Sequence, residues 1–225
     1  MRFFVILFDI LLLIIFTSCW NQNETGNSEI VVLDENDTNC KVVEVNDTTI
    51  QDCNYTFEEA IKGTNAPIEI INQLQLVNVH YYSTDGKIHV GQVLTNKKIA
   101  NEIIELFTFM FQEQFPVAKA NPIVKYNWND NLSMKDNNTY SFCYRNISYS
   151  KHAQGMAIDI NPFFNPMRSK IDSLPRPNKP IGAKFDPSVP GTLYSTHPVV
   201  IKLKNMGFKW GHYYKRNYDD HHFEK

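Results

Sequence analysis

The chain lacks any Cys-x-x-Cys pair, any internal repeat and any run of lysine and arginine residues. Because its four cysteines have no paired ligand spacing, a thiolate zinc finger is excluded. A formal net charge of −2 without a basic cluster gives no sign of a nucleic-acid partner. The composition, 43 % hydrophobic and 20 % charged, is that of an ordinary globular protein. At 225 residues the chain can hold one domain of about 150 residues and extra segments.

The N-terminus carries one short apolar segment. Residues 3–16 are apolar except for Asp9, too few positions for a membrane span but suited to a secretory signal. We predict that residues 1–19 are a signal peptide. The small residues before Cys19 resemble a lipobox, which would make Cys19 a lipidated first residue; the alternative is an ordinary cleavage site. The sequence therefore predicts an exported protein of the cell envelope that meets a membrane only through this lipid.

A polar segment, residues 20–66, comes next. It is rich in Asn, Asp, Thr and Glu and has no sustained periodicity, so we expect a largely disordered tether. In an exported chain Cys40 and Cys53 can form a disulfide that closes a short loop; the alternative is two unpaired thiols. Residues 67–225 then form the folded domain.

Hydrophobic patterns within that domain predict a hairpin, two helices and several short strands. The first helix has a candidate cap at Thr95 or Asn96, and Gly207 ends the second. Residues 161–190 hold most of the eleven prolines, which favours a long ordered loop or a lid over regular structure. The expected strands are 74–82, 88–94, 123–126, 140–145, 156–161, 208–210 and 222–224, and the expected helices are 95–114 and 198–206.

One stretch, residues 149–162, places His152 and Asp159 on either side of Gly155. If residues 156–161 form a strand, its isoleucines face the core and Asp159 points into a polar cleft. Gly155 permits a bend, so that both side chains can reach one point. A carboxylate between isoleucines needs a partner, and a metal cation would supply one.

The C-terminal residues 219–224 supply a further ligand and a carboxylate. His222 is expected in a short final strand, with Asp219 at its entrance. One residue of this cluster can complete a catalytic zinc site, and another can act as general base on water. Spacing alone does not exclude His221 as the ligand in place of His222, so both remain candidates.

The two segments together resemble the zinc D-Ala-D-Ala carboxypeptidase and L-alanyl-D-glutamate endopeptidase family. From Ser150 to Asp159 the sequence matches the family pattern Ser-x-His-x-x-Gly-x-Ala-x-Asp, and residues 219–223 match its late Asp-x-x-His-Phe. Further matches, including Phe115-Pro116 and residues 207–211, extend the similarity over roughly residues 70–225. The resemblance implies an α+β domain of the hedgehog/DD-peptidase type, with helices packed on a small antiparallel sheet.

The resemblance also assigns a role to each matching residue. Asp219 matches the catalytic carboxylate, and Arg145 matches an arginine that binds substrate and assists catalysis. Ser150 matches the motif serine near the substrate. The residues that match the ligands of a single Zn²⁺ ion are His152, Asp159 and His222.

The implied activity is hydrolysis of the peptidoglycan stem peptide, with a D-Ala-D-Ala carboxypeptidase as the main expectation. The alternatives are an L-alanyl-D-glutamate endopeptidase and a non-catalytic zinc-binding module of the cell wall. The presence of Asp219 argues against the module. His212 and Tyr214 stand where the family more often has glycine and tryptophan, which affects the expected shape of the substrate groove. His212 and His221 are expected to be solvent-facing or to lie beside the ligands.

Overall fold

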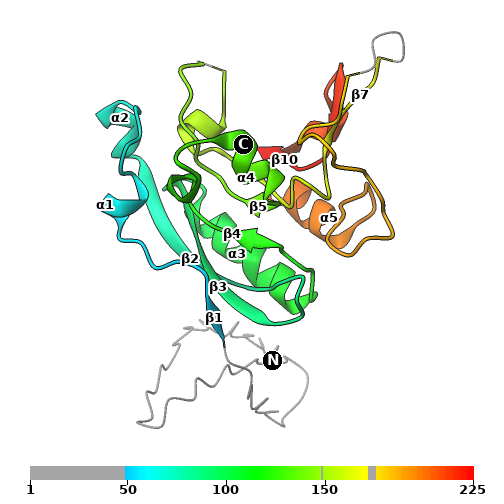
Figure 1. The fold of residues 1–225 in the computed structure, drawn as a ribbon, viewed down its shortest axis with the longest axis horizontal. Coiled ribbons are helices and arrows are strands. Elements are labelled where there is room, and N and C mark those ends of the chain that lie inside the picture. The colour runs from blue at the N-terminus through cyan, green and yellow to red at the C-terminus, as the bar shows by residue number, and fades with distance from the viewer. Residues whose placement is uncertain (1–48, 148, 172–175) are drawn as a thin grey trace, which may run out of the picture. The chain divides into compact units, whose positions relative to one another are not determined.

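The computed structural model describes residues 49–147, 149–171 and 176–225 (Figure 1). The predicted signal peptide, the lipobox at Cys19 and most of the predicted tether fall outside the described residues. Cys40 does too, so the Cys40–Cys53 disulfide remains a prediction. Within the described part of the chain, no helix has both the length and the hydropathy needed to cross a membrane.

The predicted disorder up to residue 66 is wrong from residue 49 onward. Strand β1 (Ile50–Gln51) pairs in parallel with β3 (Ile88–Asn96). Helices α1 (Phe57–Ala60) and α2 (Ile68–Ile71) follow it, and Thr56 closes a capping box on α1. This segment is ordered because its apolar side chains pack on the sheet. The resulting cluster has Ala60, Leu74, Leu94 and Phe142 at its centre, with Tyr55, Phe57, Ile61 and Ile70 among its partly buried members.

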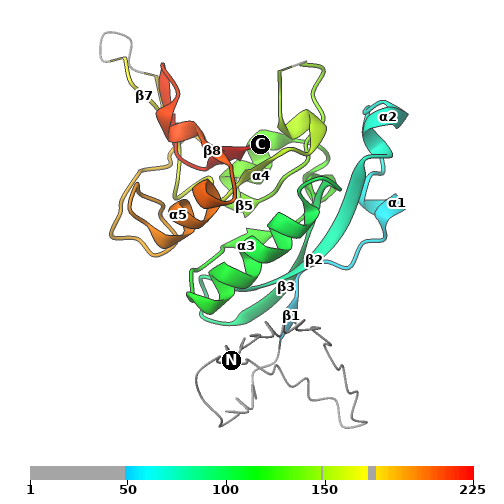
Figure 2. The same cartoon turned by 180° about the vertical axis from the view of Figure 1, so that it is seen from behind.

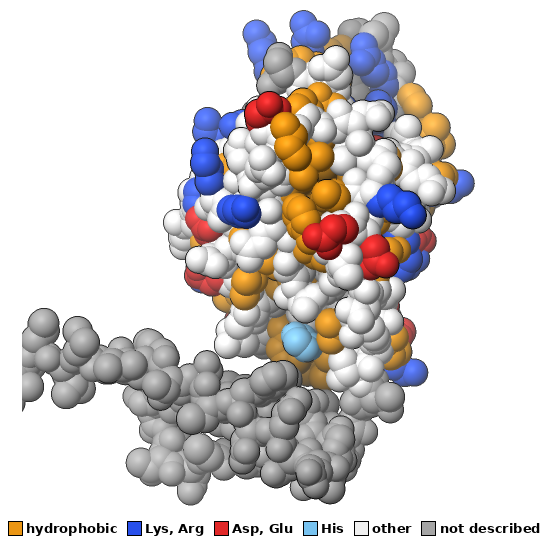
Figure 3. All heavy atoms as spheres, turned by 90° about the vertical axis from the view of Figure 1, so that its left-hand side faces the viewer, with side chains coloured by type: hydrophobic (Ala, Val, Ile, Leu, Met, Phe, Trp, Pro, Cys, Tyr) orange, Lys and Arg blue, Asp and Glu red, His pale blue; other side chains and the backbone are white. Residues whose placement is uncertain are grey.

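The outer side of this cluster is incompletely covered. A space-filling view of the face that carries α1 and α2 shows hydrophobic side chains in a stripe between polar ones (Figure 3). A groove of about 580 Å³ lies there, lined by residues of α1, α2, β2 and β3 together with several amides. This face is separate from the predicted catalytic residues, none of which lines the groove.

A long hairpin and one helix form the main core. Strand β2 (Leu74–Tyr82) pairs antiparallel with β3, as the alternation predicted, and α3 (Ala100–Gln112) packs against β2 (Figure 2). The helix begins later than the predicted cap, because Thr95 and Asn96 remain in the sheet opposite Gln75 and Leu74. Its buried side is that of an amphipathic helix. The main core includes Val77, Val79 and Tyr81 of β2 and Ile103, Leu106, Phe107 and Met110 of α3.

Two short segments differ from their predicted form. Residues 123–126 form a 3-10 helix after Pro122 instead of a strand. Residues 140–145 are not a strand either; of these, Tyr140 makes an isolated bridge to Asp159. Helix α4 (Asp130–Lys135) lies between these two segments and is capped by the Asn129 side chain. Strands β4 (Lys119–Ala120) and β5 (Asn138–Thr139) pair in parallel beside it.

The C-terminal half forms a second small sheet. It consists of β6 (Ala157–Asp159), β10 (His222–Glu224) and β8 (Lys209–Trp210), in that order and antiparallel throughout. Helix α5 (Pro198–Asn205) packs behind it, and the side chain of His197 caps its N-terminus. Gly207 follows with a φ of +86°, which fits its predicted role as a stop signal.

The proline-rich segment is not wholly irregular. Strand β7 (Met167–Ser169) pairs antiparallel with β9 (Asn217–Asp219), and this pair projects beyond α5 (Figure 1). The remaining described residues of the segment form turns and extended loops. Pairing with β9 joins the segment to the strand that ends at Asp219. The whole is α+β, as predicted, with small sheets and short helices around the hairpin core.

Candidate metal centre

His152 is positioned by a short 3-10 helix and the glycine that ends it. The helix η2 spans His152–Gln154, and Gly155 follows with a φ of +65°. A Cβ on Gly155 would lie 2.8 Å from the backbone nitrogen of Asn96, so the close approach also requires glycine. The bend predicted at Gly155 is therefore present, and it turns the chain from η2 into β6.

Asp159 and His222 face each other across the small sheet. In the antiparallel pairing of β6 and β10, His222 lies directly opposite Asp159. Opposed residues project on the same face of an antiparallel pair, so the two side chains are neighbours. Ile158 and Ile160 are fully buried in the main core on the other face, as the predicted alternation requires.

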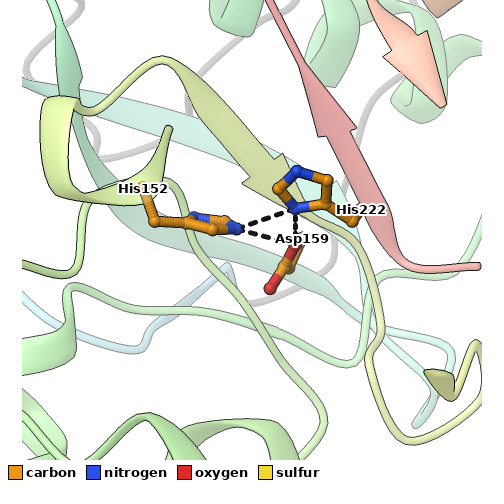
Figure 4. Close-up of side chains that lie close together, drawn as sticks. All are labelled: His152, Asp159 and His222. Carbon is orange, nitrogen blue, oxygen red and sulfur yellow. Dashed lines mark hydrogen bonds and ion pairs between the residues drawn. The ribbon is translucent and has the colours of Figure 1, made fainter. Parts of the chain in front are cut away.

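These elements bring three side chains to one point (Figure 4). Nε2 of His152 lies 3.0 Å from Oδ1 of Asp159 and 2.9 Å from Nδ1 of His222. Nδ1 of His222 lies 3.0 Å from the same oxygen of Asp159. All three residues are buried, and their ligand atoms lie within 4.8 Å of one another.

The outer nitrogens of the two rings are already engaged. Nδ1 of His152 donates to the backbone carbonyl of Ser141 at 2.6 Å, and Nε2 of His222 donates to Glu224 at 3.2 Å. When the rings are neutral and carry these outer hydrogens, each turns the lone pair of its other nitrogen toward Asp159. Three electron-pair donors at such distances repel one another unless a cation lies among them.

The pKa shifts of Asp159 and His222 also show that the site favours a positive charge. Burial alone would raise the pKa of Asp159, but His152 and the neighbouring histidines hold it well below its usual range. Burial lowers the pKa of His222, yet Asp159 and Glu224 outweigh it and raise that pKa to about 10. Two imidazoles and a carboxylate, each held by an outer hydrogen bond or sheet pairing, fit a divalent metal ion.

A cavity of about 490 Å³ opens onto this centre. Arg145 lines it and forms an ion pair with Asp130, with its Nη2 at 3.2 Å from Oδ2. Ser150 also lines it, and its hydroxyl accepts a hydrogen bond from the backbone of Ala153 at 3.4 Å. The structure thus collects all the predicted site residues around one cavity: His152, Asp159, His222, Asp219, Arg145 and Ser150.

Sequence reasoning left several neighbours without a role. Glu224 orients His222, a function that its place two residues further along the same strand face could have suggested. His221 is buried beside Asp219, and His212 is half-buried against Asp220. Of the two environments expected for His221, the structure thus shows the one beside the ligands. No sequence signal marked Asp220, which is fully buried and paired with Arg168.

Residues 145–225 match a peptidase family model described as D-alanyl-D-alanine carboxypeptidase. No curated protein and no solved structure matches the chain. The matched region contains Arg145, both ligand-bearing segments and the strands that pair them. Residues 145–225 are thus similar to a family of D-alanyl-D-alanine carboxypeptidases, in agreement with the resemblance that the motifs indicated.

Proposed function

We propose that this protein is a zinc-dependent peptidase that hydrolyses the stem peptide of peptidoglycan, with a terminal D-alanyl-D-alanine as its first expected target. The observation that carries the proposal is the convergence of a metal-ligand triad and Asp219 on one cavity. A catalytic zinc site needs three protein ligands and an open side for water and substrate. The similarity to a peptidase family supports a peptide substrate.

The proposed ligands are His152, Asp159 and His222. When bound there, zinc would act as a Lewis acid that polarises the scissile carbonyl and brings the pKa of water to about 7. Ser141 and Glu224 fix the two imidazole rings through their outer nitrogens, so the donor atoms are held in place before substrate arrives.

Asp219 is the proposed general base and acid. Its carboxylate lines the cavity next to the ligands, where it can take a proton from the attacking water and deliver it to the leaving amine. Arg145 places a positive charge on the same cavity, where it can hold a substrate carboxylate or a developing oxyanion. Its ion pair with Asp130 keeps the guanidinium in position.

A peptidase of this kind belongs where peptidoglycan is. The predicted signal peptide supports export, and lipid attachment at Cys19 would hold the enzyme at the cell envelope. An L-alanyl-D-glutamate endopeptidase remains the second candidate, since the same residues would perform either cut. A non-catalytic wall-binding module is disfavoured by the presence of Asp219 at the cavity.

In the deciding experiment, the purified zinc-loaded protein is incubated with defined muropeptides, with and without a chelator, and the masses of the products are determined. Loss of a single terminal alanine indicates a carboxypeptidase, and separation of alanine from glutamate indicates an endopeptidase. Unchanged peptides in the presence of zinc would sink the proposal. The matched variant Asp219→Asn should retain zinc and lose turnover by at least about 100-fold.

A further inference from the structure

His221 lies between the metal centre and the proposed general base. The residue is buried, with 4 % of its surface exposed, and Nδ1 of its ring donates to the backbone carbonyl of Asn165 at 2.7 Å. Its own backbone carbonyl accepts from the amide of Ile160 at 3.0 Å. The ring is thus fixed on one side by Asn165, and only Nε2 is free to make a further contact.

That nitrogen approaches two carboxylates. Nε2 of His221 lies 3.0 Å from Oδ1 of Asp219 and 3.7 Å from Oδ2 of Asp159. Oδ1 of Asp219 is buried and accepts no well-aligned hydrogen bond within the described part of the chain. A buried carboxylate oxygen in that state is costly unless a neighbouring charge compensates it. The imidazole of His221 is the basic group at ion-pair distance.

We propose that His221 is a positioning residue that fixes the carboxylate of Asp219 against the ligand Asp159, and so sets where the general base stands. The inference rests on the proposed function, because it assumes that Asp219 acts as the base. His221 contacts one oxygen of the proposed ligand Asp159 and one oxygen of the proposed base Asp219, so it holds the two carboxylates at a fixed distance from each other. Misplacing a catalytic group by even about 1 Å lowers turnover strongly.

The orientation of the ring agrees with this role. Its Nδ1 is held by the carbonyl of Asn165, so Nε2 faces the two carboxylates. No other basic side chain forms an ion pair with Asp219 among the residues that the structure describes.

Two substitutions separate the two nitrogens of the ring. In His221→Asn the amide nitrogen can replace Nδ1 and keep the bond to Asn165, while the contact with Asp219 is lost. In His221→Gln the longer side chain can place an amide N–H where Nε2 stands, which restores a donor to Asp219. If His221 positions the base, glutamine should rescue activity and asparagine should not.

The test measures kcat and KM on the muropeptide that the wild type cleaves, with zinc content determined for each protein. We expect His221→Asn to lower kcat about 10–100-fold with KM and zinc stoichiometry unchanged, and His221→Gln to lose markedly less. Equal losses in both variants would show that ring packing alone matters. An unchanged kcat in His221→Asn, or loss of zinc, would overturn the inference as well.

A second readout does not depend on activity. Thermal unfolding of His221→Asn, Asp219→Asn and the double variant forms a mutant cycle, in which a direct contact makes the shifts non-additive. Additive shifts would reject the contact. If the wild type cleaves no peptide but the cycle is non-additive, the proposed function fails while the link between the two residues stands.

Discussion

Nε2 of His152 and Nδ1 of His222 face each other at 2.9 Å, although the two residues are 70 positions apart in the chain. Neither ring can turn away freely, because Ser141 holds one and Glu224 holds the other from the outer side. When these nitrogens carry no proton, their lone pairs face each other, and this arrangement favours the binding of a cation. Both the energetics of the fold and its chemistry depend on this arrangement.

Metal binding should stabilise the fold. A ligand at about 1,000 times its dissociation constant adds about 4 kcal/mol to the free energy of unfolding, or roughly 8–16 °C in midpoint for a domain of this size. We expect a chelator to lower the midpoint of the zinc-loaded protein by that amount, measured by calorimetry. In Asp159→Ala the chelator should have almost no effect. An equal shift in both proteins would mean that zinc binds elsewhere.

Glu224 should raise the zinc affinity without touching the metal. It accepts the outer hydrogen of His222 at 3.2 Å, and such carboxylate partners orient the ligand and increase its basicity. Glu224→Gln should weaken zinc binding about 10–100-fold in competition with a chromophoric chelator. Glu102→Gln, which breaks a surface pair with Lys225 at 2.8 Å, is the matched control. Equal affinities for the two variants would contradict this role.

Gly155 combines a positive φ with a close backbone approach, and these two effects can be separated. Gly182 also has a positive φ, of +89°, but nothing lies within 4 Å of the position that a Cβ would take there. Gly182→Ala should cost about 1–2 kcal/mol of unfolding free energy from the backbone alone. Gly155→Ala should cost roughly 2–5 kcal/mol, because the contact with Asn96 adds to it.

The shift forced by an alanine at Gly155 should also displace His152, since η2 ends there. Zinc affinity is the readout that distinguishes this effect from general destabilisation. It should fall in Gly155→Ala and stay unchanged in Gly182→Ala. Equal losses of unfolding free energy in Gly155→Ala and Gly182→Ala, measured by denaturant titration, would show that the structure relieves the close contact without cost.

Arg168 should stabilise the fold through a buried carboxylate. Asp220 is fully buried. Its Oδ2 accepts a hydrogen bond from Nε of Arg168 at 2.9 Å and lies 2.7 Å from Nη2 of the same arginine. Arg168→Met removes these bonds and the cation–π contact with Phe185, and it leaves Asp220 with His212, whose Nδ1 lies 2.6 Å from Oδ1. We expect a loss of about 2–3 kcal/mol, less than for a wholly unpaired buried charge because His212 remains.

Lys119→Met is the control for this prediction. Its ion pair with Asp136 is about half exposed on both sides, so its removal should cost about 0–1 kcal/mol in the same denaturant titration. A loss in Arg168→Met no larger than in Lys119→Met would show that burial of Asp220 adds nothing to the pair.

His197 should make helix α5 sensitive to acid. Its Nδ1 accepts the amide of Val199 at 3.2 Å, and burial lowers its pKa. The folded pKa is thus below the unfolded value of about 6.5, so the unfolded chain takes up the proton first as the pH falls. The stability from this cap is present above about pH 6.5 and is lost below it.

Asparagine also caps helices but does not titrate. Between about pH 7.5 and pH 5, we expect the wild type to lose about 1 kcal/mol more unfolding free energy than His197→Asn. Chemical denaturation at the two pH values measures this difference. Parallel losses would assign the acid sensitivity to other groups.

Local patterns in the sequence predicted much of the framework, because hydrophobic spacing reports directly on the buried face of a long element. The β2–β3 hairpin and the buried side of α3 follow from alternation and helical spacing. Short apolar runs carry no such information. Residues 123–126 form a 3-10 helix after Pro122, and residues 140–143 are buried by packing without forming a strand.

The sequence by itself determined the donor set, since only His152, Asp159 and the late histidines offered that chemistry in the matching motifs. Spacing alone left His221 and His222 as rival ligands, and the family motif favoured His222. The tertiary structure decided between them, because the register of β10 against β6 sets His222 opposite Asp159. His221 lies just before that strand and contacts Asp219 instead. Register between segments 63 residues apart depends on packing of the whole sheet, which no local pattern encodes.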